Sequence, residues 1–435
     1  MQHSYDSLDR PGGFRRRHLL TPLRHRDFRV LWMGMTVSLI GDGIFLVAIA
    51  WETYTLWNAP AALAIVGIGM TVPTIAFLLV GGVVSDRYDR RLVMAWADGL
   101  RAVAVGALAI LIFTGTLQFW QLVVVVAFYG IGTAFFMPAF DAIVPDLIPK
   151  PELPAANALD QFVRPIALRL VGPVAGGALV ALSAGLAFTV DAASFAVSLA
   201  AVLVIPKTTQ SDGEPQTSPS VALKEGLRFV RGRVWLWGTL VSAAFGYLLF
   251  LGPAEVLLPY LVKNELHASA GTLGLVVAAG GLGAVGAAVF MGQRGHPRRD
   301  VTVMYVTWTL ATLAIAGYGI ANAAWQLMIA CLLFNALEAA GTIVWATIKQ
   351  RHVPGSMLGR VSSLDWLVSI ALMPLSFALT APVAAVVGVR ATLVGAAVLG
   401  AAVTAGAYFL PGMTAIEQTN ARGRGGWRVP VDVTD

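Results

Sequence analysis

Two carboxyl groups and one guanidinium group lie near the middle of long apolar runs in the 435-residue sequence: Asp42, Glu338 and Arg169. An ionisable side chain at the centre of a bilayer is costly, so each one marks a candidate functional site. Desolvation favours the protonated form of a carboxyl group, which can then bind and release a proton near neutral pH. We expect Asp42 to be the proton-coupling group, with Glu338 as second candidate and Arg169 as the modulating charge.

Depth supports this choice. Asp42 lies about 12 residues into its apolar run, which is ~18 Å at the helical rise and close to the middle of a bilayer. A structural role stays open for Asp42 and for Glu338, because a buried carboxylate can simply pair with a neighbouring helix. Asp98 and Arg101 are three positions apart, and we expect them to neutralise each other on one helix face.

The composition is that of a membrane protein. Hydrophobic residues make up 57% of the chain and charged residues 12%, whereas soluble domains carry about 25% charged residues. The formal net charge is +6, but the basic residues form short clusters without interleaved aromatic residues, which argues against a nucleic-acid surface. The single cysteine, Cys331, allows neither an intrachain disulfide nor a thiolate metal site. We expect no nucleic acid, no cofactor and no metal.

Twelve apolar runs are long enough to cross a hydrocarbon core of ~30 Å, which takes ~20 helical residues. The first six lie near 30–56, 61–84, 92–114, 121–144, 158–182 and 186–205. The other six lie near 234–261, 270–291, 301–320, 326–348, 361–386 and 390–410. The predicted fold is an all-α integral membrane protein with twelve transmembrane helices in two six-helix bundles.

The expected parts of the chain follow from these runs. They are an N-terminal tail 1–29, a bundle 30–205, a central loop 206–233, a second bundle 234–411 and a C-terminal tail 412–435. The central loop ends in VALKEGLRFVRGR, whose apolar residues recur at helical spacing. We expect this segment to lie along the membrane surface.

The distribution of Lys and Arg predicts the orientation. Of the 30 Lys and Arg residues, 25 lie in tails and connections on one side of the predicted spans. The connections on the other side hold only Lys263 and Arg390. Cytoplasmic connections carry the excess of basic residues, so both termini are predicted to be cytoplasmic in a multi-pass protein of the cell membrane.

A weak internal repeat relates the two predicted bundles. Shifting the second half back by 205 positions aligns Pro354, Leu358, Leu364, Asp365 and Val368 with Pro149, Leu153, Leu159, Asp160 and Val163. The bundles are therefore expected to be related by a pseudo-two-fold axis along the membrane normal. That architecture places a substrate near the midplane between two rocking halves.

Two motifs carry a resemblance to a known family. The connection after the second run contains Gly82-Val-Val-Ser-Asp86-Arg87-Tyr-Asp-Arg90-Arg91, and the fifth run contains Gly172-Pro173-Val-Ala-Gly176-Gly177. The first resembles the loop signature G-x-x-x-D-R-x-G-R-R of the major facilitator superfamily, with Asp89 in place of the second glycine. The second is similar to the G-P-x-x-G-G element of its antiporter branches.

Longer segments resemble a narrower branch of that superfamily. They are FFMPAFDAIVPDLIPKPELPAANAL, LKEGLRFVR and VPGSMLGRVSSL. They look like the drug and siderophore exporter branch, the "transmembrane secretion effector" type that includes enterobactin exporters and macrolide-efflux pumps. In the superfamily's fold, spans 1, 4, 7 and 10 line the cavity, which implies that Asp42, Glu255 and Glu338 are pathway residues. One departure is Val126, which stands where many drug–proton antiporters carry an arginine.

The loop signature implies a gate. In the related family this loop, here with Gly82, Asp86, Arg87, Arg90 and Arg91, braces the first half against the start of span 11, where this chain has Asp365. By the repeat, Asp160 would face Arg294, Arg298 and Arg299. We expect two symmetric cytoplasmic latches, closed when the protein opens outward. The alternative is that Asp160 and Asp365 only favour helix starts through the backbone dipole.

The resemblance implies a secondary active exporter of small amphiphilic molecules, driven by proton antiport through alternating access. All six histidines lie outside the predicted spans and no catalytic constellation appears at membrane depth, so an enzyme is not expected. The chain contains no G-x-x-x-x-G-K-[ST] phosphate-binding loop of an ATP-driven pump. A dedicated siderophore, metabolite or lipid exporter and a proton-coupled importer stay open. The family default is a monomer whose partners are substrate, protons and lipid.

Overall fold

The computed structural model describes residues 20–207, 219–294, 297 and 299–417. Over these residues the protein is all α-helical, with twelve helical spans long and apolar enough to cross a membrane. This confirms the predicted fold class and the number of spans. The predicted tails 1–29 and 412–435 lie largely outside the described residues, and the domain boundaries stay predictions.

The first half of the chain forms six spans. They are α1 (Arg26–Leu56), α2 (Pro60–Arg87), α3 (Arg90–Phe113), α4 (Phe119–Leu147), a fifth span of α5 (Leu153–Pro165), η3 (Ile166–Val171) and α6 (Gly172–Leu182), and α7 (Ala184–Val204). Two short 3-10 turns, η1 (Thr21–Arg24) and η2 (Lys150–Glu152), precede the first and fifth spans.

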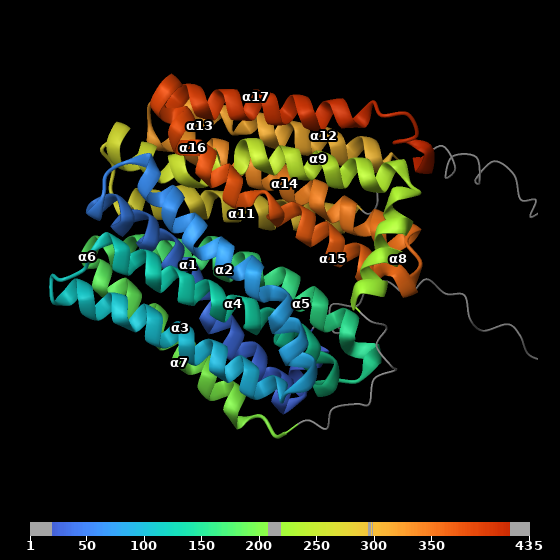
Figure 1. Cartoon of the computed structure of the whole chain (residues 1–435), viewed down its shortest axis with the longest axis horizontal. Coiled ribbons are helices and arrows are strands. Elements are labelled where there is room, and N and C mark those ends of the chain that lie inside the picture. The colour runs from blue at the N-terminus through green and yellow to red at the C-terminus, as the bar shows by residue number, and fades with distance from the viewer. Residues whose placement is uncertain (1–19, 208–218, 295–296, 298, 418–435) are drawn as a thin grey trace, which may run out of the picture.

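The second half repeats the pattern. Its spans are α9 (Val234–Gly252) continued by η4 (Pro253–Leu257), α10 (Leu258–Tyr260) and η5 (Leu261–Glu265); α11 (Ala270–Arg294); α12 (Asp300–Ala314) with α13 (Ala316–Ile320); α14 (Ala324–His352); α15 (Gly355–Ala371) with α16 (Met373–Val387); and α17 (Val389–Tyr408). The remaining helix, α8 (Pro219–Arg231), runs across the end of the bundle before α9 (Figure 1). The segment expected to be helical thus forms a helix, and its location along the membrane surface stays a prediction.

Prolines explain where two of these spans change helical type. Pro173 has no N–H to donate to the carbonyl of Arg169, and the preceding segment Ile166–Val171 is a π-helix. Pro259 likewise cannot donate to the carbonyl of Glu255, which lies in the π-helical η4. A π-helical turn inside an α-helix often marks a functional site. Both turns carry a charged residue predicted from the sequence.

The two halves form separate bundles that meet mainly along α6 with η3, α11, α2 and α16 (Figure 1). Within the first half α2 packs on α4, and α3 and α1 pack on α7; within the second α11 and α12 pack on α14. Between the halves, α11 runs along α6 and η3, and α16 runs along α2.

The two ends of the molecule differ in packing. We call the end that carries α8 and the turn between α2 and α3 the basic end, and the other the opposite end. Toward the opposite end one cluster of buried apolar side chains joins both halves, from Phe45 and Tyr54 to Leu257 and Phe377. Toward the basic end the first and second halves have separate clusters. The halves are thus packed together at one end and apart at the other.

Several hydrogen bonds between the halves lie at the opposite end. The Tyr54 hydroxyl donates to the Val256 carbonyl at 2.6 Å, and the Asn58 amide donates to Asn264 Oδ1 at 2.7 Å. Lys263 Nζ donates to Thr55 Oγ1 at 2.7 Å. Asn58 and Asn264 are 206 positions apart, close to the offset of the sequence repeat, so these two residues face each other across the pseudo-two-fold axis.

Candidate functional site

Asp42 lies on α1 between two glycines that allow close helix contact. A Cβ on Gly41 would meet Ser194 and Asp191 of α7, and a Cβ on Gly43 would lie 2.8 Å from the Cα of Gly172. The Asp42 side chain is half-buried, and its Oδ1 accepts a hydrogen bond from the Tyr129 hydroxyl. Asp42 therefore remains partly accessible while α1 is clamped on both sides.

Four further residues surround Asp42 inside the first half. Arg101 and Asp98 of α3 form an ion pair, and their side chains are 4% and 0% exposed. Asp191 of α7 is 0% exposed. The charge of Arg101 acts on both Asp42 and Asp191. We call Asp42, Asp98, Arg101, Tyr129 and Asp191 the first-half cluster.

Aromatic rings enclose this cluster. The Arg101 guanidinium lies 4.7 Å from the centroid of the Phe136 ring and 4.3 Å from that of Phe195. The Tyr129 ring stacks on Phe45 with centroids 4.4 Å apart. Contact with the faces of aromatic rings stabilises a desolvated cation. The predicted neutralisation of Asp98 by Arg101 is confirmed, but α3 also brings this pair to Asp42, which the sequence did not indicate.

Of the other predicted charges, Arg169 lies where the halves meet, and Glu255 and Glu338 lie on spans of the second half. Arg169 Nη1 donates to Asn335 Oδ1 of α14 at 2.9 Å, which joins the first half to the second. Glu255 is exposed and lies within electrostatic range of Arg169. Glu338 accepts a 2.9 Å hydrogen bond from Thr342. We call Arg169, Glu255, Asn335 and Glu338 the interface cluster.

The predicted proton-coupling residues therefore fall into two groups. Asp42 belongs to the first-half cluster, where the cations acting on it are Arg101 and Arg164. Arg169 acts instead on Glu255. The roles of all four residues stay predictions. Sequence reasoning selected neither Asn335 nor Asp191 as a site residue, and the available signal was a polar residue within an apolar run.

The Gly172-Pro173-Val-Ala-Gly176-Gly177 element is a three-helix junction. A Cβ on Gly172 would lie 2.6 Å from the Cα of Gly43, and one on Gly176 would lie 2.9 Å from the Cα of Ile44. On its other face, a Cβ on Gly177 would lie 3.0 Å from the Cα of Gly271 of α11. Small residues let membrane helices approach closely. The element holds α6 against α1 of its own half and α11 of the other.

The gate loop is ordered by contacts inside the first half. The Asp89 carboxylate accepts hydrogen bonds from the backbone N–H and the side chain of Arg91 at 2.7–3.1 Å, and so caps α3. Hydrogen bonding to Arg91 lowers the pKa of Asp89. Arg91 also donates to the Ile205 carbonyl at the end of α7. Arg87 is exposed, and a Cβ on Gly82 would have no neighbour within 4 Å.

Among the described residues, neither predicted latch is formed. Arg90 pairs with Asp146 at the end of α4. Asp365 pairs with Lys349 and accepts a 2.9 Å hydrogen bond from Trp345, both in α14 of its own half. The side chains of Asp86 and Arg298 lie outside the described residues.

The second predicted latch residue also stays within its own half. Asp160 pairs with Arg164 one turn along α5, at 3.2 Å. The latches are predicted for the state in which the basic end is closed, and here that end is open. They stay predictions.

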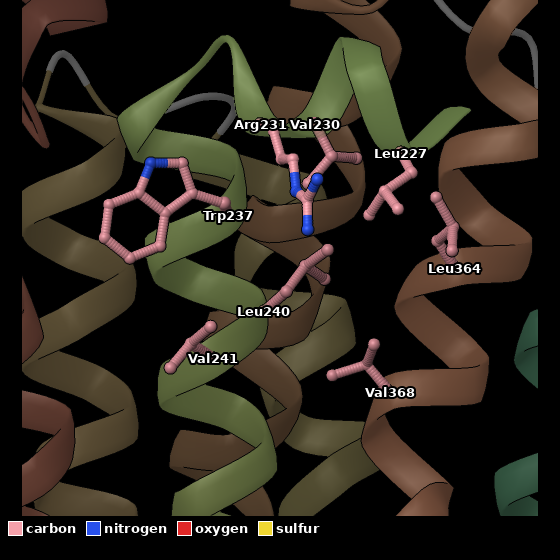
Figure 2. A pocket seen from close by; sticks show the side chains of 8 residues that line it. All are labelled: Leu227, Val230, Arg231, Trp237, Leu240, Val241, Leu364 and Val368. Atoms are coloured by element: carbon pink, nitrogen blue, oxygen red, sulfur yellow. The ribbon is translucent and has the colours of Figure 1, made fainter. Parts of the chain in front are cut away.

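Two cavities lie toward the basic end. One, of about 420 Å³, lies between α8, α9 and α15, and Figure 2 shows Arg231 at its upper edge above apolar side chains. Its lining residues are Leu227, Val230, Arg231, Trp237, Leu240, Val241, Leu364 and Val368. The other, of about 270 Å³, lies between α1, α4 and α5 and includes Asp141 and Asp160.

Twelve spans in two bundles, with charges where the bundles meet, define a transporter of the major facilitator fold. The chain belongs to the transmembrane secretion effector family, whose model matches residues 18–432. It is therefore a multi-pass membrane protein that transports a small molecule across the bilayer, and not an enzyme.

Relatives of known name narrow the class. The enterobactin exporter EntS of Citrobacter koseri is 27% identical over 347 residues, which cover 78% of this chain and 81% of the relative. EntS of Salmonella typhimurium is 26% identical over the same shares of each chain. The resemblance to the exporter branch is thus confirmed.

Solved structures share the fold. A bacterial homologue of the iron transporter ferroportin in an inward-facing state matches with a TM-score of 0.65 and 18% identity, over 88% of this chain and 99% of the other. The nucleoside transporter NupG matches with a TM-score of 0.64 and 11% identity, over 89% of this chain and 99% of the other.

Proposed function

We propose that this protein is a secondary active exporter that moves small amphiphilic molecules out of the cell in exchange for protons. It works in the cell membrane, with both termini cytoplasmic, as a monomer. The two halves rock about the packed helices, and the substrate binds near the midplane between them. The basic end is the cytoplasmic end, so this structure corresponds to the inward-open state.

The half-buried Asp42 carboxyl group is the observation that carries the proposal. A carboxyl group at membrane depth that water can partly reach can exchange a proton with the open side. The Tyr129 hydroxyl and the charge of Arg101 stabilise its ionised form. Release of the proton toward the cytoplasm therefore leaves a stabilised carboxylate, and proton entry from the other side neutralises it.

The interface cluster supports a separate place for the substrate. Arg169 and Glu255 are exposed and lie on π-helical turns of the two halves, and Glu338 is half-buried on α14. A cation and two carboxyl groups there offer partners to an amphiphile with polar groups of either sign. Movement of one half relative to the other changes the distances among these charges, which couples substrate binding to rocking.

A dedicated siderophore exporter is the second candidate. The named relatives are enterobactin exporters at 26–27% identity. The exposed guanidinium of Arg169 suits the anionic oxygens of such a ligand, because guanidinium groups bind oxyanions strongly. A lipid exporter and a proton-coupled importer are further alternatives, which the vesicle transport assay described next distinguishes.

Transport into everted membrane vesicles tests the function. With an acidic interior, we expect the wild-type protein to accumulate at least one member of a panel of cationic drugs, macrolides, catecholate siderophores and fluorescent lipids. A protonophore and Asp42→Asn should each abolish accumulation. The matched control is Asp27→Asn, which removes a carboxyl group from the first turn of the same helix.

The results separate the alternatives. Uptake that survives both the protonophore and Asp42→Asn contradicts proton antiport through Asp42. Accumulation of siderophores alone identifies a dedicated exporter, and accumulation in right-side-out vesicles driven by an acidic exterior identifies an importer.

A further inference from the structure

The first-half cluster contains more carboxyl groups than cations. Asp42, Asp98 and Asp191 come from α1, α3 and α7, and Arg101 of α3 is the cation that acts on all three. Arg164 of α5 acts on Asp42 as well, but it is paired with Asp160. Three ionised carboxylates here would leave uncompensated negative charge in a low-dielectric region, which is strongly unfavourable.

Hydrogen bonds and ion pairs show which carboxyl group pairs with Arg101. Asp98 forms the ion pair with Arg101, and Asp42 accepts the hydroxyl hydrogen bond of Tyr129. Asp191 is 0% exposed, its Oδ1 lies 3.4 Å from Ser194 Oγ, and its Oδ2 has no hydrogen-bond partner among the described residues. An isolated carboxylate in such a place is very costly, whereas a neutral carboxylic acid costs far less.

Accessibility separates the two remaining carboxyl groups. Asp42 is half-buried, while Asp191 is sealed behind α1, where Gly41 lies against Asp191 and Ser194. A proton on Asp42 can therefore reach water from this state, and a proton on Asp191 cannot. The charge of Asp42 nevertheless acts on Asp191.

We propose that Asp191 is a second proton-binding site that keeps its proton while Asp42 exchanges one. This rests on the proposed function for its role in transport. On release, the O–H bond of Asp42 breaks and the proton leaves to water. The electron pair stays on the Asp42 carboxylate, which Tyr129 and Arg101 then stabilise. Because Asp191 stays neutral, the cluster never holds more than two carboxylates. This lowers the electrostatic cost of ionising Asp42.

Infrared spectroscopy of the purified full-length protein in lipid tests the proposal. At neutral pH we expect a C=O stretching band from a protonated, desolvated carboxyl group. The frequency of this band should shift once the carboxyl proton has been exchanged for deuterium. Asp191→Asn should remove this band. Asp27→Asn removes a carboxyl group outside the first-half cluster; it is the control and should leave the band unchanged. An unchanged band in Asp191→Asn overturns the proposal.

Thermal unfolding of the wild type, Asp191→Asn and Asp98→Asn gives an independent measurement. Asp191→Asn replaces a neutral acid by a neutral amide of the same shape, so we expect its melting temperature to equal or exceed that of the wild type. Asp98→Asn should lower the melting temperature by several degrees, because Arg101 loses its ion-pair partner. The reverse order, with Asp191→Asn as the less stable protein, contradicts a protonated Asp191.

Neither measurement requires transport, so their failure is distinct from a failure of the proposed function. If Asp191→Asn does not fold, Ser194→Ala removes the hydroxyl 3.4 Å from Asp191 Oδ1 and should shift the frequency of the same band. A band that keeps its frequency in Ser194→Ala also counts against Asp191. If Asp191→Asn loses the band but transport does not depend on pH, Asp191 is a proton-binding site and the proposal of proton antiport is wrong.

Discussion

At the scale of single residues, Asp89 shows how a departure from a motif can be explained. The family signature has a glycine at this position, and here the Asp89 side chain caps α3 through the N–H of Arg91. Asp is among the most favourable N-cap residues because its oxygen accepts from the first turn of the helix. The side chain thus orders the loop whose basic residues gave the first resemblance.

This cap makes a prediction about stability and pH. Asp89→Ala should lower the stability of the first half by about 1 kcal/mol at neutral pH. The pKa of Asp89 is lowered by Arg91, so the contribution is complete above the ordinary carboxyl value of about 3.9. It is lost as the pH falls through the lowered value of the folded protein.

Melting curves of wild type and Asp89→Ala from neutral pH to about pH 3 measure this. Asp89→Asn is the control, because asparagine also caps a helix well and should melt close to the wild type at neutral pH. A difference between wild type and Asp89→Ala that persists unchanged at the acid end would show that the carboxylate charge has no part in it.

Depth along an apolar run identified some site residues and missed others. Asp42 was found because it is a lone carboxyl group near the middle of a run. Asp191 was not selected, since depth alone does not tell which helix face turns toward Asp42. The same holds for Arg101, which was expected only to neutralise Asp98, although its helix α3 packs on both α4 and α7.

At the scale of helices, the glycines of α6 and α11 determine how the bundles meet. A stripe of α11 glycines lies against other helices, because a Cβ on any of them would come within 3 Å of a neighbouring atom: Gly274, Gly280, Gly281 and Gly283. A Cβ on Gly286 would have no neighbour within 4 Å. Where this stripe ends depends on the partner helix, which the sequence of α11 alone does not identify.

The junction element yields a prediction with an internal control. Gly176→Ala places a Cβ 2.9 Å from the Cα and carbonyl oxygen of Ile44, so the two backbones must separate. We expect a loss of about 1–3 kcal/mol, as for other overpacked sites, together with reduced transport. Gly286→Ala should change neither.

Thermal unfolding in detergent and vesicle transport of the two variants provide the comparison. Equal behaviour of Gly176→Ala and Gly286→Ala would mean that α1 and α6 are free to move apart, contrary to the close contact described here.

At the scale of the whole molecule, the twelve spans were predictable and the conformation was not. Each span is an apolar run of adequate length, and its boundaries can be recognised within a few residues. Which end of the two halves is closed depends on small differences in free energy between packings of the same helices. The separate apolar clusters at the basic end, which show that this end is the open one, could be recognised only in the structure.

Rocking of the halves can be tested by a crosslink across the axis. Asn58 and Asn264 touch at the closed end, and the only native cysteine, Cys331, is buried. In the double variant Asn58→Cys/Asn264→Cys, oxidation should lock this end and stop transport, and a reducing agent should restore it. Either single variant should transport normally under both conditions. Full transport by the crosslinked protein would contradict opening at this end.

The predicted latches would form in the other conformation, in which the basic end is closed. If Arg90 and Asp365 meet when the basic end closes, Asp365→Arg should abolish transport and adding Arg90→Asp should restore part of it. Each residue has a partner in its own half here, so closure must exchange these ion pairs. No recovery in the double variant would argue against the pairing.

The π-helical turn at Ile166–Val171 has a consequence for how such a span can change in sequence. A π turn accommodates one residue more than the α-helix on either side of it needs. Deleting a residue within this turn should therefore leave both flanking helices in phase with their neighbours, whereas a deletion three turns away rotates everything beyond it by about 100°. A span with a built-in surplus residue can gain or lose it without disturbing the contacts that hold the two bundles together.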